Sequence, residues 1–386
     1  MPYTPPTVNY SATINGTYTS LTGIQSVSVI RGRQRFQDDF VQSSCTVEII
    51  PATTYSLALS VGQFLDVRDT NTTGSTCYFQ GIITDIERQY AMPYNAGTGL
   101  APADRIIITA SGATGSLGRT AVSNWTVNAQ PVNLSVVEIM LNANVRVLDQ
   151  FTTQVYNSAQ TFTGSSLELI NYLLRTEQWY LDDVDNNRAA SPVYLLYANR
   201  FPPGQGNTSH TFSDAGTVGA YKFTNLQFLS SVQNNFTQVQ VVTTGLTTQI
   251  ASTGSAPFNS LIYNAYSATT TAALSLANYV LNLQSVTTPS PFSITTDTNV
   301  ALTCTTISAL STKTNLDGGT LGMNLGAAVT VIFRGATTTA SIQGINTTFY
   351  PDYATVQLFL SPSLGTGFTL DSSAFGVLDT NRLGYP

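Results

Sequence analysis

Charged residues are scarce in this chain of 386 residues. Asp, Glu, Lys and Arg make up 9% of the sequence, against roughly 25% in a typical soluble domain. Disordered chains are rich in charge and poor in aromatic residues, whereas this chain has 19 tyrosines and 18 phenylalanines. A surface built mainly from Thr, Ser, Asn and Gln offers little protection against self-association. We therefore expect a folded protein whose surface is largely covered by partners.

The chain also lacks the positive charge that nucleic-acid binding requires. Its formal net charge is −6. The lysines are Lys222 and Lys313, and the local basic cluster consists of Arg31, Arg33 and Arg35. A groove that neutralises several phosphates needs more than this. We interpret the three arginines as solvated or interface residues and expect no specific binding of nucleic acid.

Histidine and cysteine are too few for most catalytic or metal sites. His210 is the single histidine and lies among polar residues of a predicted loop, where a Ser-His-Asp or Cys-His mechanism would lack an orienting partner. Cys45, Cys77 and Cys304 contain no C-x-x-C pair, and one histidine with three scattered cysteines does not make a usual zinc site. We predict buried free thiols, no metal, no cofactor and no catalytic residue.

Long apolar runs and targeting signals are missing as well. No stretch approaches the roughly 18 uninterrupted apolar residues of a membrane span. The first residues, MPYTPPTVNY, contain no basic segment followed by an apolar run, so we expect no secretory signal. The segment with Gly112, Gly115 and Gly118 has no lysine and no clear following helix, so it does not predict a phosphate-binding loop.

One acidic stretch has the spacing of a calcium loop. Asp183, Asp185 and Asn187 match the first three ligands of an EF-hand. Arg188 replaces the glycine of the sixth position, and Tyr194 stands at the twelfth, where a glutamate is expected. A polar turn is the favoured interpretation. The sequence leaves open whether the three residues bind a cation.

Short alternating segments rich in β-branched and aromatic residues fill both ends of the chain, which is typical of a sandwich or small barrel. We predict strands at 24–30, 45–50, 64–68, 77–79 continuing into 81–86, 105–110, 292–295, 300–306, 328–333, 339–349 and 355–360. Apolar residues recur with helical spacing in the middle of the chain. These predict helices at 132–141, 165–175 and 268–284.

One pattern occurs twice. G-x-x-L-x-V begins at Gly62 and G-x-x-V-x-V begins at Gly326, and each is followed by Q-G-I, with the glycine at Gly81 and at Gly344. In each copy a strand precedes a turn, and a second strand carries a glycine that marks a bend or bulge. Coincidence in a chain rich in Gly and Thr is one interpretation. The other, which we favour, is that Gly81 and Gly344 hold equivalent positions in two related β-barrels.

Motifs at both ends of the chain, in the same order, carry a family resemblance. The N-terminal ones are S-V-S-V-I-R-G-R-Q-R-F-Q-D-D-F from Ser26, C-T-V-E-I from Cys45, V-G-Q-F-L-D-V from Val61, Y-F-Q-G-I from Tyr78 and S-L-G-R from Ser116. The C-terminal ones are G-A-A-V-T-V from Gly326, I-Q-G-I from Ile342 and A-F-G-V-L-D-T-N-R-L-G from Ala374. This combination resembles the minor tail proteins of long-tailed bacteriophages. The resemblance covers the middle of the chain only loosely.

Within that family, two barrels separated by an insertion resemble baseplate or tail-tip hub proteins. The resemblance implies a homotrimer whose two barrels per chain present six similar units to the hexameric tail tube. It implies a structural virion protein, not an enzyme, that closes the tube and organises host attachment and genome passage at the distal end of the tail, after assembly in the host cytoplasm. Its implied partners are the tube or distal-tail ring, the tape measure and fibres, with DNA passing through the lumen unbound and no membrane insertion.

The predicted fold is therefore mainly β with some α, made of two related antiparallel β-barrels and a mixed α/β insertion between them. We expect an N-terminal barrel at 1–125, a middle lobe at 126–225, a second barrel with the inserted helix 268–284 at 226–365, and a tail at 366–386. Two alternatives remain open. One is a hexameric distal-tail ring protein, and the other is a carbohydrate-binding host-attachment protein whose tyrosines would stack on sugars.

Overall fold

The computed structural model describes residues 3–13, 16–50, 59–69, 77–90, 104–143, 145, 156–177, 180–183, 210–215, 217, 219–229, 236–254, 256–284, 290–298 and 325–362. The chain is mainly β, as predicted, and the described part contains 18 strands and four helices. The strands are β1 (Thr7–Ser11), β2 (Thr19–Ser20), β3 (Ile24–Gly32), β4 (Ser44–Ile49), β5 (Phe64–Arg68), β6 (Cys77–Gln89), β7 (Arg105–Ser111), β8 (Ala121–Val127), β9 (Gln160–Ser165), β10 (His210–Ser213), β11 (Asn225–Leu229), β12 (Gln238–Val242), β13 (Gln249–Ser252), β14 (Ser260–Asn264), β15 (Ser290–Asp297), β16 (Ala328–Phe333), β17 (Ala336–Phe349) and β18 (Ala354–Pro362). The helices are α1 (Ala113–Arg119), α2 (Val132–Asn142), α3 (Ser166–Glu177) and α4 (Thr270–Gln284).

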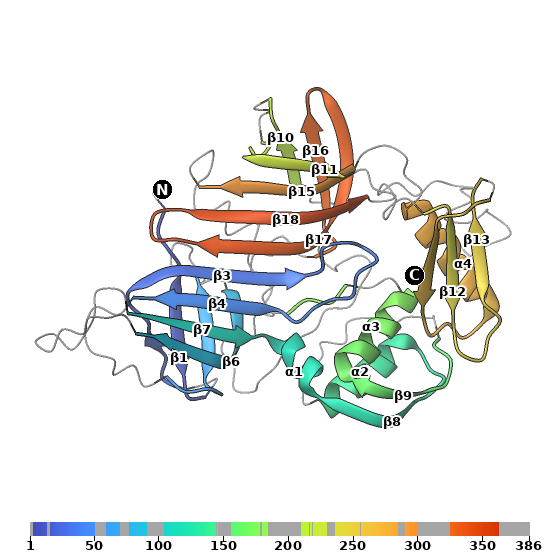
Figure 1. Cartoon of the computed structure of the whole chain (residues 1–386), viewed down its shortest axis with the longest axis horizontal. Helices are drawn as coiled ribbons and strands as arrows, with labels where there is room; N and C mark the ends of the chain where they lie inside the picture. Colours follow the sequence, from blue (N-terminus) through green and yellow to red (C-terminus); the bar gives the residue numbers. More distant parts are fainter. Residues whose placement is uncertain are drawn as a thin grey trace, which may run out of the picture.

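Thirteen strands form one large sheet, in which neighbouring strands are mostly antiparallel. Its main path is β11-β15-β18-β17-β3-β4-β7-β6-β5-β1-β2, and β16 branches from β17 and pairs with β10. The strands of both predicted barrels thus share one sheet, joined where β17 pairs with β3. In Figure 1 β10 and β16 are oriented steeply to β15 and β18, as β1 is to β3 and β4.

The sheet consists of two halves with the same topology. The N-terminal half-sheet has the order β3-β4-β7-β6-β5-β1, and the C-terminal half-sheet has the order β11-β15-β18-β17-β16-β10. The chain visits the strands of both halves in the same sequence, so that β3 corresponds to β11, β4 to β15, β7 to β18, β6 to β17, β5 to β16 and β1 to β10. The halves differ at one end, because β1 is antiparallel to β5 whereas β10 is parallel to β16.

The glycines at the start of β5 and β16 occupy matching places. Gly62 and Gly326 have φ angles of +91° and +85°, a conformation that glycine adopts without steric cost. The N–H of Gly62 donates to the carbonyl of Ile83 over 2.9 Å, and that of Gly326 donates to the carbonyl of Ile342 over 2.8 Å. In both hairpins the register with the following strand shifts directly after this isoleucine, which places a β-bulge at the same point.

The second glycine of each repeat does not follow this alignment. When the hairpins are matched on their pairing registers, Gly81 corresponds to Ala340, and Gly344 corresponds to Asp85. Gly81 and Gly344 therefore lie on corresponding strands but four residues apart. The Q-G-I match misaligned the two copies, because the two glycines lie close to different neighbouring segments of the chain. Gly344 faces Gly32 of β3.

A helical lobe follows the N-terminal half-sheet. In it α1, α2 and α3 pack with the antiparallel pair of strands β8 and β9, and their apolar side chains join the core of the large sheet. Ile170, Leu173 and Leu174 of α3 are buried, as the helical spacing predicts, while Leu167 is partly buried. The boundary expected at residue 125 falls inside β8.

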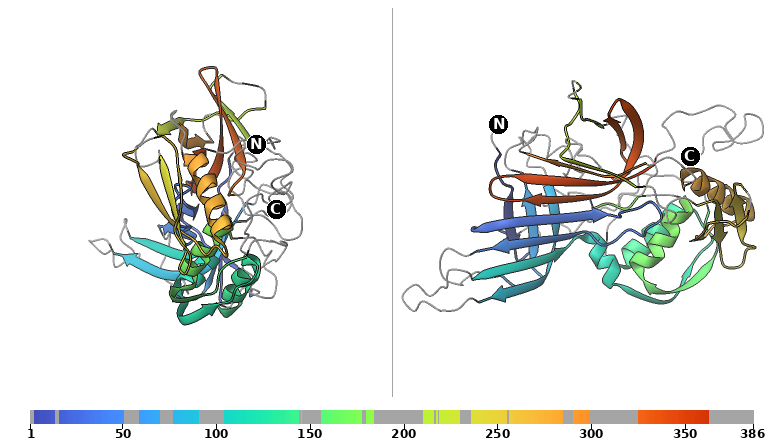
Figure 2. Two further views of the ribbon diagram at one scale, coloured as in Figure 1. Left: turned by 90° about the vertical axis from the view of Figure 1, so that its right-hand side faces the viewer. Right: turned by 45° about the horizontal axis from the view of Figure 1, so that its top comes forward.

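A smaller unit with its own core is inserted between β11 and β15. It consists of the sheet β13-β12-β14, and Figure 2 shows α4 lying over one face of this sheet. Its core includes the buried side chains of α4 at Ala273, Leu276, Ala277, Val280 and Leu281, which recur with helical spacing, and those of Val239, Val241 and Tyr263. Phe36 from the loop after β3 completes it.

The predicted elements that fall within the described residues are confirmed. The sequence did not predict the strands β1, β2 and β8 to β14 or the helix α1, which lies where no clear helix was expected after Gly112. The boundary expected at 225 separates β10 from its partner β16. The predicted strand 300–306, the tail 366–386, Cys304, Asp185 and Asn187 lie outside the described residues. Cys45 and Cys77 are buried thiols, as expected.

Candidate functional site: a buried polar junction

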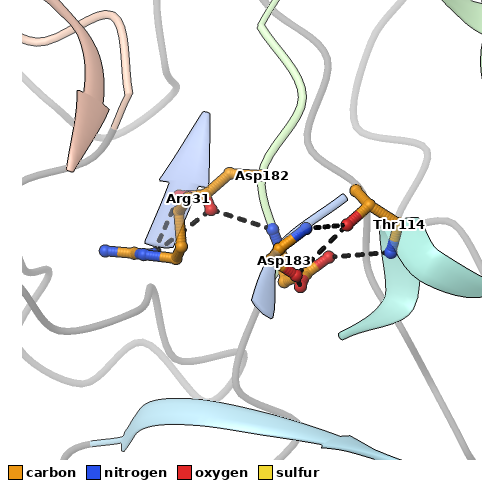
Figure 3. A network of polar contacts seen from close by, with 5 residues as sticks. Arg31, Thr114, Asp182 and Asp183 are labelled. Atoms are coloured by element: carbon orange, nitrogen blue, oxygen red, sulfur yellow. Dashed lines mark hydrogen bonds and ion pairs between the residues drawn. The ribbon is translucent and has the colours of Figure 1, made fainter. Parts of the chain in front are cut away.

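Two consecutive aspartates, Asp182 and Asp183, lie where the N-terminal half-sheet meets the helical lobe (Figure 3). Arg31, near the end of β3, reaches Asp182 with its Nη1 atom 3.1 Å from Oδ2 and 3.2 Å from Oδ1. The two side chains are 1% and 8% exposed. A buried ion pair has to balance the cost of removing both charges from water, and the backbone N–H of Asp183 helps by donating to Asp182 Oδ1 over 2.9 Å.

Asp183 connects the same segment to α1 and to the start of β4. Its Oδ1 accepts the backbone N–H of Thr114 over 3.3 Å, and its Oδ2 accepts the hydroxyl of Ser43. The Thr114 hydroxyl in turn accepts the N–H of Ser43 over 2.6 Å. A carboxylate at the first turn of a helix satisfies N–H groups that have no partner within the helix. Asp183 thus fixes α1 against the sheet.

Arg33 connects the two half-sheets. Its guanidinium lies 4.3 Å from the centre of the Phe40 ring, 5.0 Å from that of Phe36 and 5.4 Å from that of Tyr180. Its Nε donates to Gln343 Oε1 of β17 over 3.0 Å, and the amide of Gln343 donates to the Tyr180 hydroxyl over 3.1 Å. Burial lowers the pKa of Arg33 from its usual value, and the nearby Tyr180 and Asp38 oppose this shift. Cation–π contacts of a desolvated guanidinium are worth about 2 kcal/mol.

The interpretation of the basic cluster as solvated or interface arginines is wrong for two of its three members. Arg31 is 2% exposed and Arg33 is 7% exposed, whereas Arg35 is partly exposed. The sequence pattern could not show this, because their partners Asp182 and Gln343 lie 151 and 310 residues away. The one available signal was that Arg31 continues the alternating strand β3.

The junction has the features of a structural centre. Asp182 accepts hydrogen bonds from Arg31, and Asp183 accepts them from the Ser43 hydroxyl and the Thr114 backbone N–H. Asp185 and Asn187, the other residues with calcium-loop spacing, lie outside the described residues. No group of three or more His, Cys, Asp or Glu side chains gathers in the described part of the chain. The arrangement can hold three bodies of the protein together: the two half-sheets and the helical lobe.

His210 begins β10 rather than lying in an exposed loop. Its Nδ1 is 3.3 Å from the Tyr221 hydroxyl, and the two rings are stacked. Burial lowers the pKa of His210 below its usual value and raises that of Tyr221. The neutral imidazole is therefore the form that suits the folded protein.

The stability of the protein should consequently fall as the pH drops through the ordinary histidine pKa, near 6.5. Below that pH the unfolded chain binds a proton that the folded chain resists, so protonation favours unfolding. Chemical denaturation between pH 5 and 8 measures this, and His210 is the only histidine that titrates there. The variant His210→Gln should remove the slope. A slope that persists in this variant would assign it to another group.

Comparison with solved structures identifies the fold. The chain resembles the tail protein from Neisseria meningitidis MC58, with a TM-score of 0.60 and 11% identity over 94% of this chain and 97% of that one. It also resembles the 43 kDa tail protein of prophage MuSo2 from Shewanella oneidensis, with a TM-score of 0.59 and 13% identity over 92% and 98%. For prophage tail protein gp18 from Listeria monocytogenes the TM-score is 0.50, with 10% identity over 92% and 94%. The chain thus has the fold of prophage tail proteins.

Sequence comparison adds nothing further. No protein-family model matches the chain, and no curated protein matches it significantly. Among the described residues, no helix is long and apolar enough to cross a membrane.

Proposed function

We propose that this chain, which has the fold of prophage tail proteins, is a structural protein of a phage tail and acts as the hub at the tail tip or baseplate. The observation that carries the proposal is the duplicated half-sheet within a fold shared over more than nine-tenths of the chain. Two similar units in each chain suit a hub that must match a tail-tube ring with twice as many subunits as the hub has chains. The buried junction would hold the two units in a fixed relation.

The proposed assembly is a homotrimer with pseudo-sixfold character. Three chains contribute six half-sheets, which can seat on a hexameric tube. Closed rings use heterologous contacts, in which each subunit offers two different patches. The sparse charge of the chain supports this, because Thr, Asn and Tyr can be buried between subunits without the cost of desolvating ions.

The remaining roles follow from this position. The ring would close the tail tube, contact the distal-tail ring, tape measure and fibres, and lie at the distal end of a virion assembled in the host cytoplasm. DNA would pass through its lumen without specific binding, because the net charge is −6 and the local basic cluster is largely buried. No enzymatic step is part of the proposal.

Native mass spectrometry of the purified chain tests the oligomeric state. We expect three chains per particle, because two half-sheets in each of three chains produce six units. Negative-stain images of the same sample should show rings. Six chains per ring would instead favour the hexameric distal-tail reading, and a stable monomer at high concentration would contradict both.

A further inference from the structure

We propose that neighbouring chains in this ring join by β-strand pairing. The free edge of β11 in one chain would pair, antiparallel, with the second half of β6 in the next chain. This contact would reproduce between chains the joint that β3 and β17 form within one chain. The inference rests on the proposed ring, and it specifies which surfaces meet and in which register.

The joint within the chain divides one edge of β17 between two partners. Residues from Ala336 to Ser341 pair with β16, and residues from Gly344 to Phe349 pair with β3. The other edge of β17 pairs with β18 from Ala340 to Phe349. The long strand therefore ends in a segment that extends past its own hairpin and receives a strand from the other half-sheet.

β6 corresponds to β17 and has the same extension without the partner. Its first part, from Cys77 to Ile82, pairs with β5, and its other edge pairs with β7. Past the bulge, no described strand lies on the edge that faces away from β7. The side chains of Asp85, Glu87, Arg88 and Gln89 are exposed there. Their four counterparts on β17 are buried or partly buried, and all four pair with β3.

β11 corresponds to β3 and lacks the partner on the matching side. β3 lies between β4 and β17, whereas β11 pairs only with β15 among the described strands. Exposed edge strands are normally protected by charged residues or proline. β11 has the sequence NLQFL, which contains neither, and Phe228 on it is 39% exposed. The edge of β11 in one chain could thus supply the strand partner for the second half of β6 in another.

An independent observation comes from the residue before the glycine that begins each copy of the repeat. Leu325 precedes Gly326 and is 2% exposed, because it packs at the joint beside Gly32 of β3. Val61 precedes the corresponding Gly62 and is 63% exposed. An apolar side chain that is covered at the joint within the chain is therefore uncovered where the joint between chains would form. In the same register Leu229 corresponds to Ile30 of β3, so the end of an incoming β11 would lead toward Val61.

The joint within the chain also predicts the register between chains. The paired residues of β3, β4 and β7 can be matched to those of β11, β15 and β18. This match makes Gln227 the counterpart of Ser28. The pairing of β6 with β7 and of β17 with β18 makes Gln89 the counterpart of Thr348. Ser28 faces Thr348. The expected pairs between chains are Glu87 with Leu229, Arg88 with Phe228 and Gln89 with Gln227.

The pair Gln89–Gln227 is the best position for a cross-link. The N–H of Arg33 donates to the carbonyl of Gln343, so Arg33 and Gln343 form a hydrogen-bonded pair. Such pairs recur at every second residue of β3 counted from Arg33. Ser28 lies five residues before Arg33, so Ser28–Thr348 is a pair without mutual hydrogen bonds. In antiparallel pairs without mutual hydrogen bonds the Cα atoms are about 4.5 Å apart. That distance lies within the range that a disulfide bridges.

The test mixes full-length Gln89→Cys chains with full-length Gln227→Cys chains, lets them assemble, and adds a mild oxidant such as copper–phenanthroline. We expect a two-chain band on a non-reducing gel that neither variant forms alone, because each cysteine needs the other on a neighbouring chain. The matched control pairs Gln89→Cys with Asn225→Cys. This moves one cysteine two residues along the same face, about 7 Å away, and should lower the yield of the band at least several-fold.

The outcomes separate this inference from the proposed function. A particle of three chains that forms no two-chain band, or forms it equally with the control pair, overturns the strand pairing and leaves the ring standing. A chain that stays monomeric by native mass contradicts the ring, and the strand pairing with it.

Discussion

Replacing Asp182 with alanine is expected to lower the free energy of unfolding by about 3–5 kcal/mol, the usual effect of removing one partner from a buried ion pair. The loss arises because Arg31, which is 2% exposed, would keep a charge without its carboxylate. Urea denaturation followed by circular dichroism measures the change. If Asp182→Ala does not fold, Asp182→Asn preserves the size of the side chain and should show the same direction of effect.

Two comparisons make this prediction specific. Glu48 and Arg105 form an ion pair of the same 3.1 Å length as that of Arg31 and Asp182, but their side chains are 31% and 47% exposed. Glu48→Ala should therefore cost no more than about 1 kcal/mol. The double variant Arg31→Met with Asp182→Leu should recover much of the lost stability, because it removes both charges. Equal losses for Asp182→Ala and Glu48→Ala would show that burial of the pair does not matter.

Replacing Gly32 with alanine should open the joint between the half-sheets. Gly32 has a φ of +83°, and a Cβ there would overlap the carbonyl oxygen of Gln343 and lie 2.9 Å from the Cα of Gly344. These are backbone atoms of β17, so they cannot rotate away. The left-handed conformation costs about 1–2 kcal/mol for alanine, and overpacking adds about 1–3 kcal/mol. The free energy of unfolding should fall by about 2–5 kcal/mol, measured by urea denaturation.

Gly335 provides the matched control for this substitution. It lies in the hairpin of β16 and β17 with a φ of +80°, and nothing stands within 4 Å of the position that a Cβ would take. Gly335→Ala should therefore carry only the conformational cost of about 1–2 kcal/mol. A loss as large as that of Gly32→Ala would assign the whole effect to backbone strain rather than to the close approach of the two half-sheets.

Both predictions concern the same mechanical property. Arg31 and Gly32 are neighbours on β3, the strand that carries the buried ion pair and also pairs with β17. In the proposed ring, a change in the angle between the two half-sheets of one chain would shift the half-sheets of the neighbouring chains, because each half-sheet is joined to the next around the ring. A rigid joint within the chain would therefore set the geometry that the contacts between chains complete.

The sequence by itself determined the local elements of this protein. Strands such as β3, β4 and β7 follow from alternating apolar residues, because one face of each strand is buried. The helices α2, α3 and α4 follow from apolar residues spaced to form one buried face. The repeated pattern that begins at Gly62 and at Gly326 was visible in the sequence, and both glycines adopt the positive φ angles that glycine takes without steric cost. The composition excluded a conventional zinc site and a basic nucleic-acid groove.

Tertiary structure decided how those elements meet. The small strands β12 to β14 form a separate sheet that α4 covers. The short sequence segments of these strands do not predict this arrangement. The four-residue offset between Gly81 and Gly344 depends on strand register, and pattern matching in sequence does not fix register. The burial of Arg31 and Arg33 depends on partners more than a hundred residues distant. A charge is buried only where the fold places a compensating group beside it. That placement depends on the whole chain and not on any single segment of it.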